Sequence, residues 1–227
     1  MIKMKILNLY ACLGGNRFKW DEVAKEKGIE IEVTAVELDK NIAQVYKERF
    51  PNDKIIVADA HQYLLDHFKE FDFIWSSPPC PSHSKIRITQ KTRSTFKAVY
   101  PDMKLYEEII FLNNYFDGKY CVENVTPYYE PLIHAQKRGR HLYWTNFNLP
   151  TDLNERKLDG VLCSMKNEHK KLEEFHDIKV SANLGGYRDV LRNLVDYEAG
   201  RTIFETALSI IRKKDEKQMN IFDELND

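Results

Sequence analysis

A single cysteine follows a strand-like segment and two prolines within residues 71–84. The apolar run of this segment ends in two serines, and Pro78 and Pro79 then precede Cys80. Proline fixes its own φ and biases the residue before it toward extended geometry, so the chain should be rigid just beyond the strand end. Because ligands of open α/β sheets bind beyond the carboxyl ends of strands, we expect the Cys80 thiol at the rim of a cleft. The alternative is a small buried cysteine after an ordinary turn.

Further polar side chains that could do chemistry follow residue 120. Glu123 ends a short apolar strand, as Cys80 does, and is therefore placed to reach the same cleft. Gln136, Arg138 and Arg140 alternate with other residues, and in a strand such residues face one way. They predict a wall that binds an anion or a base; a solvated sheet face is the alternative.

The N-terminal segment has the parts of a nucleotide-type pocket. A predicted strand over 6–10 leads through Gly14 and Gly15 into a helical pattern, and glycines let a ligand approach the backbone near free N–H groups. An ordinary β-α turn is the alternative. The next strand, over 31–36, ends in Glu37, which could accept hydrogen bonds from both hydroxyls of a ribose or, like Asp39, cap the following helix.

Four strands alternate with helices over the first 80 residues. The third, over 55–57, is followed by Asp59, which could accept a hydrogen bond from an adenine amino group or cap the next helix. The fourth delivers Cys80. This alternation predicts an α/β fold of Rossmann-like type, a mostly parallel sheet with right-handed crossovers and helices on both faces.

Residues 81–101 form a basic loop without any acidic residue. Its five cations are interleaved with serine and threonine, including Ser84, and are Lys85, Arg87, Lys91, Arg93 and Lys97. We expect Ser84, Lys85, Arg87, Lys91 and Arg93 to contact a nucleic-acid backbone from a loop that closes over the reacting centre. The alternative is a solvated loop.

Composition sets broad limits on the class of protein. The 227 residues are 43% hydrophobic and 30% charged with a net charge of -1, which is typical of a globular chain with a core and without a global basic signature. The four cysteines form no Cys-x-x-Cys pair, so we expect neither a zinc site nor a disulfide framework. The cysteine spacing also leads us to expect no bound metal. The N-terminus carries no long apolar segment, so we expect a cytoplasmic protein without a membrane anchor.

The chain is predicted to divide into four parts. Residues 1–148 form an α/β domain that carries the candidate catalytic and cofactor-binding residues, and 149–182, rich in mixed charge, form a small insertion, to which the family resemblance described next assigns target recognition. Residues 183–212 return to the catalytic domain and end in a helix, and 213–227 form a flexible tail.

In order and spacing these segments resemble the cytosine-5 DNA methyltransferases over nearly the whole chain except 149–181. The resemblance rests on an ordered set of motifs, namely Tyr10 to Gly15, Glu37-Leu38-Asp39, Ala58-Asp59-Ala60, Pro79-Cys80, Glu123-Asn124-Val125 and Gln136-x-Arg138-x-Arg140. Amino-group methyltransferases instead have Asp or Asn before Pro-Pro and an aromatic residue after it. The sequence departs from the family at Asn8, Tyr10, Cys12 and Pro81, where an acid, phenylalanine, glycine and glutamine are usual.

The resemblance implies transfer of a methyl group from S-adenosylmethionine to carbon 5 of cytosine in double-stranded DNA, leaving S-adenosylhomocysteine. Cys80 would add to carbon 6 of a flipped cytosine, Glu123 would bind or protonate nitrogen 3, and Arg140, supported by Arg138, would bind the base oxygen. The implied cofactor-binding residues are Tyr10, Ala11, Gly14, Gly15, Glu37, Leu38, Asp59, Ala60, Pro79 and Asn193.

Three points of function stay open at this stage. The recognition segment has only about thirty residues, so we expect a short or loosely read target or a second subunit. An enzyme of the same fold acting on RNA, or a non-catalytic member, are the alternatives; the second is disfavoured because Cys80, Glu123, Arg138 and Arg140 are all present. Residues 218–222 resemble a sliding-clamp docking peptide of bacterial proteins, which fits a bacterial or phage-infected cell.

Overall fold

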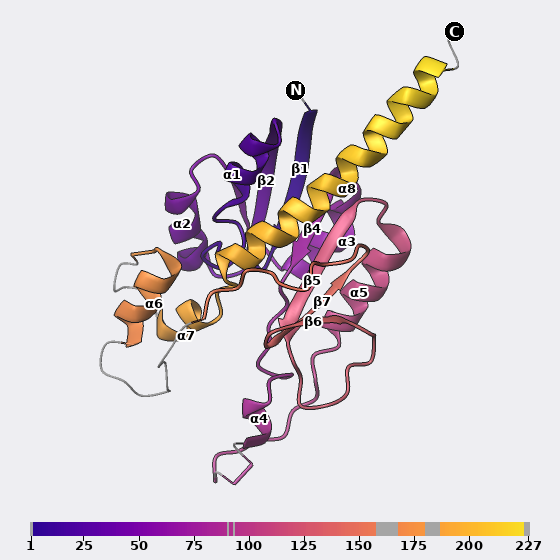
Figure 1. Ribbon diagram of the computed structural model, residues 1–227. Coiled ribbons are helices and arrows are strands. Elements are labelled where there is room, and N and C mark those ends of the chain that lie inside the picture. The colour runs from indigo at the N-terminus through magenta and orange to yellow at the C-terminus, as the bar shows by residue number, and fades with distance from the viewer. Residues whose placement is uncertain (1, 90, 93, 158–167, 180–186, 225–227) are drawn as a thin grey trace.

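The computed structural model contains one seven-stranded sheet with helices on both faces (Figure 1). It describes residues 2–89, 91–92, 94–157, 168–179 and 187–224. The strand order is β3-β2-β1-β4-β5-β7-β6. The first five strands of this order are parallel, β7 is antiparallel to β5, and β6 is antiparallel to β7. The predicted Rossmann-like α/β fold is therefore confirmed.

Strands and helices alternate through β5, as the sequence pattern predicts. The strands are β1 (Ile2–Leu9), β2 (Ile29–Glu37), β3 (Lys54–Val57), β4 (Phe73–Ser76), β5 (Lys119–Val125), β6 (Gln136–Arg138) and β7 (His141–Thr145). The helices are α1 (Trp20–Glu26), α2 (Lys40–Arg49), α3 (Ala60–His67), η1 (Phe68–Glu70), α4 (Ile86–Thr89), α5 (Lys104–Tyr115), α6 (Glu168–His176), α7 (Tyr187–Arg192) and α8 (Tyr197–Glu224).

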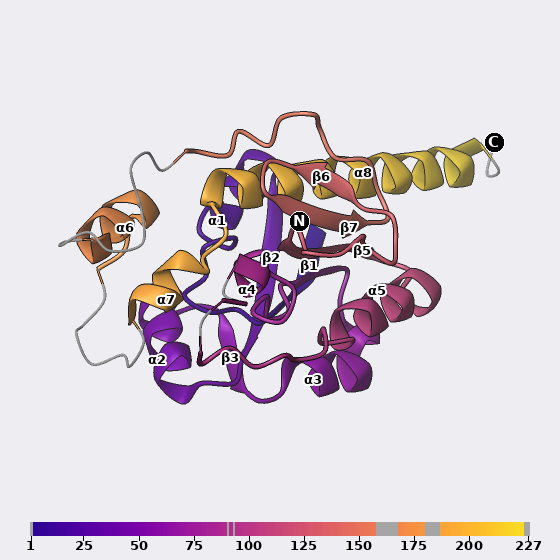
Figure 2. The same cartoon turned by 90° about the horizontal axis from the view of Figure 1, so that it is seen from below.

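Each face of the sheet carries its own hydrophobic core. Successive residues of a strand point to opposite faces, so Ile6 of β1 packs on the α1 and α8 side and Leu7 on the α3 and α5 side. Figure 2 shows these two helix layers on either side of the sheet. On the first face Trp20 stacks on Phe204 of α8 with ring centroids 5.0 Å apart. Both cores hold the central strands, whose carboxyl ends carry the polar residues of interest.

The segment between β7 and α8 packs against the sheet domain where it is described. Leu172 of α6 and Ile178 share a small core with Leu13 and Leu194. Arg49 of α2 also donates to the backbone oxygen of His176 at 3.1 Å. Residues 158–167 and 180–186, which include parts of the predicted recognition insertion and of the return to the sheet domain, lie outside the described residues.

The C-terminal segment differs from the flexible tail expected at 213–227. Helix α8 continues to Glu224 and extends past the sheet (Figure 1). Residues 213–224 contain no glycine or proline, and seven of the twelve are Lys, Glu, Gln or Met, which favour helix. The side chains of 212–224, including those of the predicted clamp peptide, lie outside the described part of the chain. Within the described residues, no helix is both long enough and apolar enough to cross a membrane.

His176 at the end of α6 makes the fold sensitive to acid. Burial, followed by the charges of Arg156, Arg49 and Arg140, lowers the pKa of His176 from 6.5 to about 4. Since the unfolded chain takes up this proton at higher pH than the folded chain, the stabilisation is present above about pH 6.5 and is lost as pH falls toward 4. We expect His176→Gln to reduce the loss of unfolding free energy between pH 7 and pH 4 by about 3 kcal/mol.

Urea unfolding at several pH values measures this change. His134→Gln is the matched control, because His134 is an exposed histidine. An equal pH dependence in the His176→Gln variant and the wild type would contradict the prediction.

Candidate active site

One cleft of about 870 Å³ lies beyond the carboxyl ends of the parallel strands. This is the edge of the sheet at which ligands of open α/β folds bind. Residues from both predicted functional groups line it, namely Tyr10, Glu37, Leu38, Asp59, Ala60, Pro79, Cys80, Ser84, Glu123, Arg140 and Asn193. Segments separated by more than 180 residues in sequence are thus brought to a single cavity.

Cys80 is held at the cleft by a fixed loop. The side chain of Asn124 on β5 donates to the carbonyl oxygen of Pro78 at 2.8 Å. After the cysteine, the backbone N–H groups of His83 and Ser84 both donate to its carbonyl oxygen, at 2.9 and 3.0 Å. The thiol is half-buried and lines the cavity. Cys80 is therefore not the small buried cysteine of the alternative interpretation.

The surroundings of Cys80 favour the neutral thiol. Burial and then the charge of Glu123 raise the pKa of the Cys80 thiol, while the charge of Arg140 acts in the opposite direction. A thiolate is the reactive form of cysteine. Activation therefore requires a change at the site, such as neutralisation of Glu123 or a closer approach of Arg140.

The prediction that Gln136, Arg138 and Arg140 face one way along a single strand is wrong. Strand β6 ends at Arg138, and a two-residue turn of Gly139 and Arg140 leads into β7. Gly139 has φ +53, a conformation that favours glycine, and the turn breaks the alternation on which the prediction depended. As a result Arg140 enters the cleft, while the guanidinium of Arg138 donates to the carbonyl oxygens of Leu149 at 2.9 Å and Pro150 at 2.6 Å.

The opposite end of the cleft has groups suited to a nucleoside. The Glu37 carboxylate accepts from the backbone N–H groups of Cys12 at 2.9 Å and Asp39 at 3.0 Å, which fixes its position at the end of β2. Asp39 caps helix α2, which was the alternative to a role in ribose binding. Its side chain accepts from two N–H groups of that helix. Asp59 caps α3 through one carboxylate oxygen and faces Lys104 at 3.5 Å with the other. Leu38 is 69% exposed and offers an apolar surface beside Glu37.

Three residues of the predicted cofactor loop lie outside the cleft lining. Ala11 is buried, and Gly14 and Gly15 are in close packing positions. Gly14 has φ +71, and a Cβ there would lie 2.3 Å from the ring of Phe50. A Cβ on Gly15 would lie 2.4 Å from the carbonyl oxygen of Val195. In this structure these glycines serve the packing of the loop, not a wall of the cavity.

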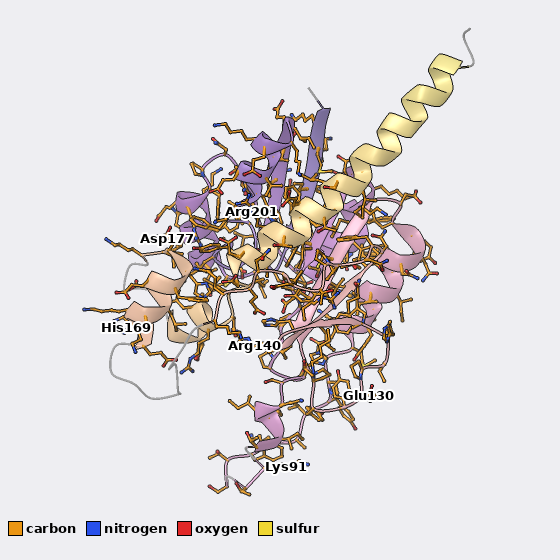
Figure 3. All side chains as sticks on the ribbon, in the orientation of Figure 1. Lys91, Glu130, Arg140, His169, Asp177 and Arg201 are labelled. Atoms are coloured by element: carbon orange, nitrogen blue, oxygen red, sulfur yellow. The ribbon has the colours of Figure 1, made fainter. Side chains whose placement is uncertain are left out.

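The basic loop projects away from the sheet with α4. Ser84 lines the cleft, and Lys85 and Lys91 are exposed, with Lys91 at the far end of the loop while Arg140 lies toward the centre (Figure 3). Arg87 instead donates to the carbonyl oxygen of Lys97 at 2.6 Å and so braces its own loop. Arg93 lies outside the described residues.

Sequence analysis missed a buried acid beneath the cleft. Glu108 of α5 is 1% exposed and accepts from the hydroxyls of Tyr10 and Ser76, both at 2.6 Å. It also lies 3.0 Å from Nδ1 of His61. The sequence does contain one indication of this residue, because Glu108 is an acid on a helix face that is otherwise apolar. Its contacts hold the ends of β1 and β4 together at the floor of the cleft.

Sequence analysis also missed His141 and Glu155. His141 lies between the carboxylates of Glu123 and Glu155. The Nε2 atom of His141 lies 3.6 Å from Oε1 of Glu123, and its Nδ1 atom lies 3.4 Å from Oε1 of Glu155. All three side chains are at least half-buried. His141 directly follows the arginine motif, but Glu155 is distant in sequence from Glu123, so no local pattern indicated the group. Among the described residues, no three His, Cys, Asp or Glu side chains converge as a metal site requires.

The chain matches one family model and is similar to several known methyltransferases over part of their length. The model of the C-5 cytosine-specific DNA methylase family matches residues 4–125. Over 84 residues, 37% of this chain and 19% of the relative, the sequence is 32% identical to the Type II methyltransferase M.BanI of Aneurinibacillus aneurinilyticus. The match therefore spans about a fifth of that protein.

Solved methyltransferases are also similar over part of their length. A mutant of Spodoptera frugiperda DNMT2 is 28% identical, with 54% of this chain and 35% of that chain covered and a TM-score of 0.37. The Entamoeba histolytica methyltransferase EhMeth is 12% identical, with 55% and 39% covered and a TM-score of 0.37.

Proposed function

Because the chain belongs to the C-5 cytosine-specific DNA methylase family, we propose that it methylates carbon 5 of a flipped cytosine in double-stranded DNA with S-adenosylmethionine as donor. One observation carries the proposal. Cys80, Glu123 and Arg140 come from three separate segments and line a single cleft. Their types match the three demands of this reaction, which are a nucleophile, an acid and a cation.

The nucleophile is required because carbon 5 of cytosine is a poor acceptor of a methyl cation. Addition of the Cys80 thiolate to carbon 6 raises the electron density at carbon 5 and makes it nucleophilic. The loop held by Asn124 presents the thiol from a fixed position. After methylation, loss of the proton on carbon 5 expels the thiolate and restores the aromatic ring.

The acid and the cation stabilise the ring while the thiolate is attached. Addition at carbon 6 pushes electrons toward nitrogen 3, where the Glu123 carboxyl can deliver a proton and hold the amino group. The Arg140 guanidinium can donate hydrogen bonds to the oxygen on carbon 2. Since protonation of Glu123 removes the negative charge that raises the pKa of Cys80, the protonated carboxyl favours the thiolate and can then give its proton to nitrogen 3 as the thiolate adds.

The residues at the other end of the cleft fit S-adenosylmethionine. The cavity of about 870 Å³ lies within the range of small-molecule sites. Glu37 can accept from two ribose hydroxyls, Leu38 can pack on the adenine, and Asp59 can accept from its amino group. When bound, the cofactor supplies an electrophilic methyl group. Asn193, beside Cys12 in the cavity lining, closes this end.

Methyl transfer from labelled S-adenosylmethionine to unmethylated duplex DNA, followed by base analysis, tests the proposed function. We expect 5-methylcytosine in DNA and little label in RNA of matched sequence. Transfer to RNA but not to DNA would instead support an RNA enzyme of the same fold. Absence of transfer to both, with cofactor binding intact, would contradict the proposal of an active enzyme.

Removal of the Glu37 carboxylate should weaken cofactor binding. We expect Glu37→Ala to raise the Kd for S-adenosylhomocysteine about 10- to 100-fold, since hydrogen bonds to a charged group contribute about 1.5–3 kcal/mol. Isothermal titration calorimetry measures this constant. Glu48→Ala on the exposed side of α2 is the control. Equal Kd values for Glu37→Ala and Glu48→Ala would remove Glu37 from the cofactor site.

A further inference from the structure

Glu123 of β5 lies beside a histidine of β7, the strand that pairs with β5. The imidazole of His141 lies between two carboxylates, with Nε2 3.6 Å from Glu123 and Nδ1 3.4 Å from Glu155. The side chains of His141 and Glu123 are 8% and 9% exposed, and that of Glu155 is 26% exposed. The three groups therefore form a path from the surface to the cleft.

The Glu155 carboxylate lies against Gly139 of the hairpin turn. A Cβ at Gly139 would lie 2.7 Å from Oε2 of Glu155. The hairpin turn that directs Arg140 into the cleft thus also makes room for the carboxylate behind His141. Beside His141, the pKa of the Glu155 carboxyl is lowered, so Glu155 stays ionised and favours a proton on the imidazole.

The proposed reaction requires Glu123 to give a proton to nitrogen 3 and to recover it later. A carboxylate cannot donate, so a proton source for Glu123 is needed within reach. We propose that His141, oriented by Glu155, is a positioning residue that supplies the Glu123 proton and takes it back in each catalytic cycle. This inference rests on the proposed function.

The proton on nitrogen 3 comes from these groups and returns to them, while the proton of the Cys80 thiol and the proton of carbon 5 pass to water. The imidazolium gives the proton on Nε2 to Oε1 of Glu123, and neutral His141 keeps the proton on Nδ1, the atom that lies 3.4 Å from Oε1 of Glu155. Glu123 then passes its proton to nitrogen 3 as the thiolate adds to carbon 6. When Cys80 leaves, the proton returns to Glu123 and then to Nε2. The resting separation of 3.6 Å must shorten to a hydrogen bond when the base binds, as catalytic hydrogen bonds often do.

Several charged or titratable groups face His141 and set its response to pH. They come from β5, from the hairpin and β7, and from the segment after β7, and are Glu123, Arg140, Tyr143 and Glu155. Because the proposed step starts from the imidazolium, the rate should fall when the proton on His141 is lost as pH rises.

The test compares His141→Gln with His134→Gln by steady-state kinetics on duplex DNA across pH. The glutamine amide can still donate a hydrogen bond to Glu123 but cannot transfer a proton. We expect kcat of His141→Gln to fall about 100-fold with KM changed less than about threefold, and its alkaline limb to shift. His134, an exposed residue outside the cleft lining, should give wild-type values as glutamine.

Glu155→Gln provides an independent variant if His141→Gln folds poorly. We expect its kcat to fall about tenfold with the alkaline limb moved to lower pH, because the imidazolium loses its ionised partner. A wild-type enzyme that makes no 5-methylcytosine would refute the proposed function itself. An active wild type whose pH profile is unchanged in both folded variants would overturn only the role of His141.

Discussion

Cys80→Ser is expected to abolish methyl transfer to cytosine while cofactor binding is retained. A serine hydroxyl is far less ionised and less nucleophilic than a thiol at neutral pH. We expect kcat to fall by at least about 10³-fold, with the Kd for S-adenosylhomocysteine within about twofold of wild type. Single-turnover methyl transfer to duplex DNA and calorimetry measure the two quantities.

A covalent adduct provides the second readout of this variant. Fluorine at carbon 5 of the target cytosine prevents the final proton loss, so the wild-type enzyme should remain attached to the base and Cys80→Ser should not. Cys121→Ala is the matched control, because Cys121 is fully buried in the core between α8 and the sheet. That control should lose about 1 kcal/mol of stability and still form the adduct. Methyl transfer by Cys80→Ser at more than a tenth of the wild-type rate would refute the nucleophile assignment.

Sequence reasoning located those site residues that stand at the ends of parallel strands. Cys80 follows β4, Glu123 lies near the carboxyl end of β5, and Glu37 ends β2. The carboxyl ends of neighbouring parallel strands meet at one edge of the sheet, so their position follows from the alternation of strands and helices alone. Local pattern and topology were sufficient for these residues.

Other features depend on contacts that no local pattern contains. The turn at Gly139 decides that Arg140 enters the cleft, and Gly14 is required by the ring of Phe50. Both are tertiary approaches between distant segments. The group of His141 and Glu155 behind Glu123 depends on the same kind of contact. The role of a residue that depends on contacts between distant segments could not be predicted from the sequence, even where the residue itself was noticed.

The segment after β7 supports the hairpin of β6 and β7 with much of its described length. The carbonyl oxygens of Leu149 and Pro150 accept from Arg138, and Glu155 contacts His141. Arg156 then pairs with Asp196 ahead of α8 at 2.8 Å. The described residues 149–157 thus support the hairpin of β6 and β7, and the expectation of a short or loosely read target stays a prediction.

Arg140→Ala and Arg138→Ala should separate catalysis from stability within one motif. Arg140 faces the cleft, so its loss should lower kcat about 10²- to 10³-fold with little change in unfolding free energy. Arg138 instead binds two carbonyl oxygens, so its loss should lower unfolding free energy by about 1–3 kcal/mol and kcat by less than about tenfold. Kinetics and urea unfolding of both variants measure these effects. Because each arginine belongs to the same hairpin and differs only in the side of the turn on which it lies, an equal loss of kcat in a fully folded Arg138→Ala would mean that both side chains act on the base.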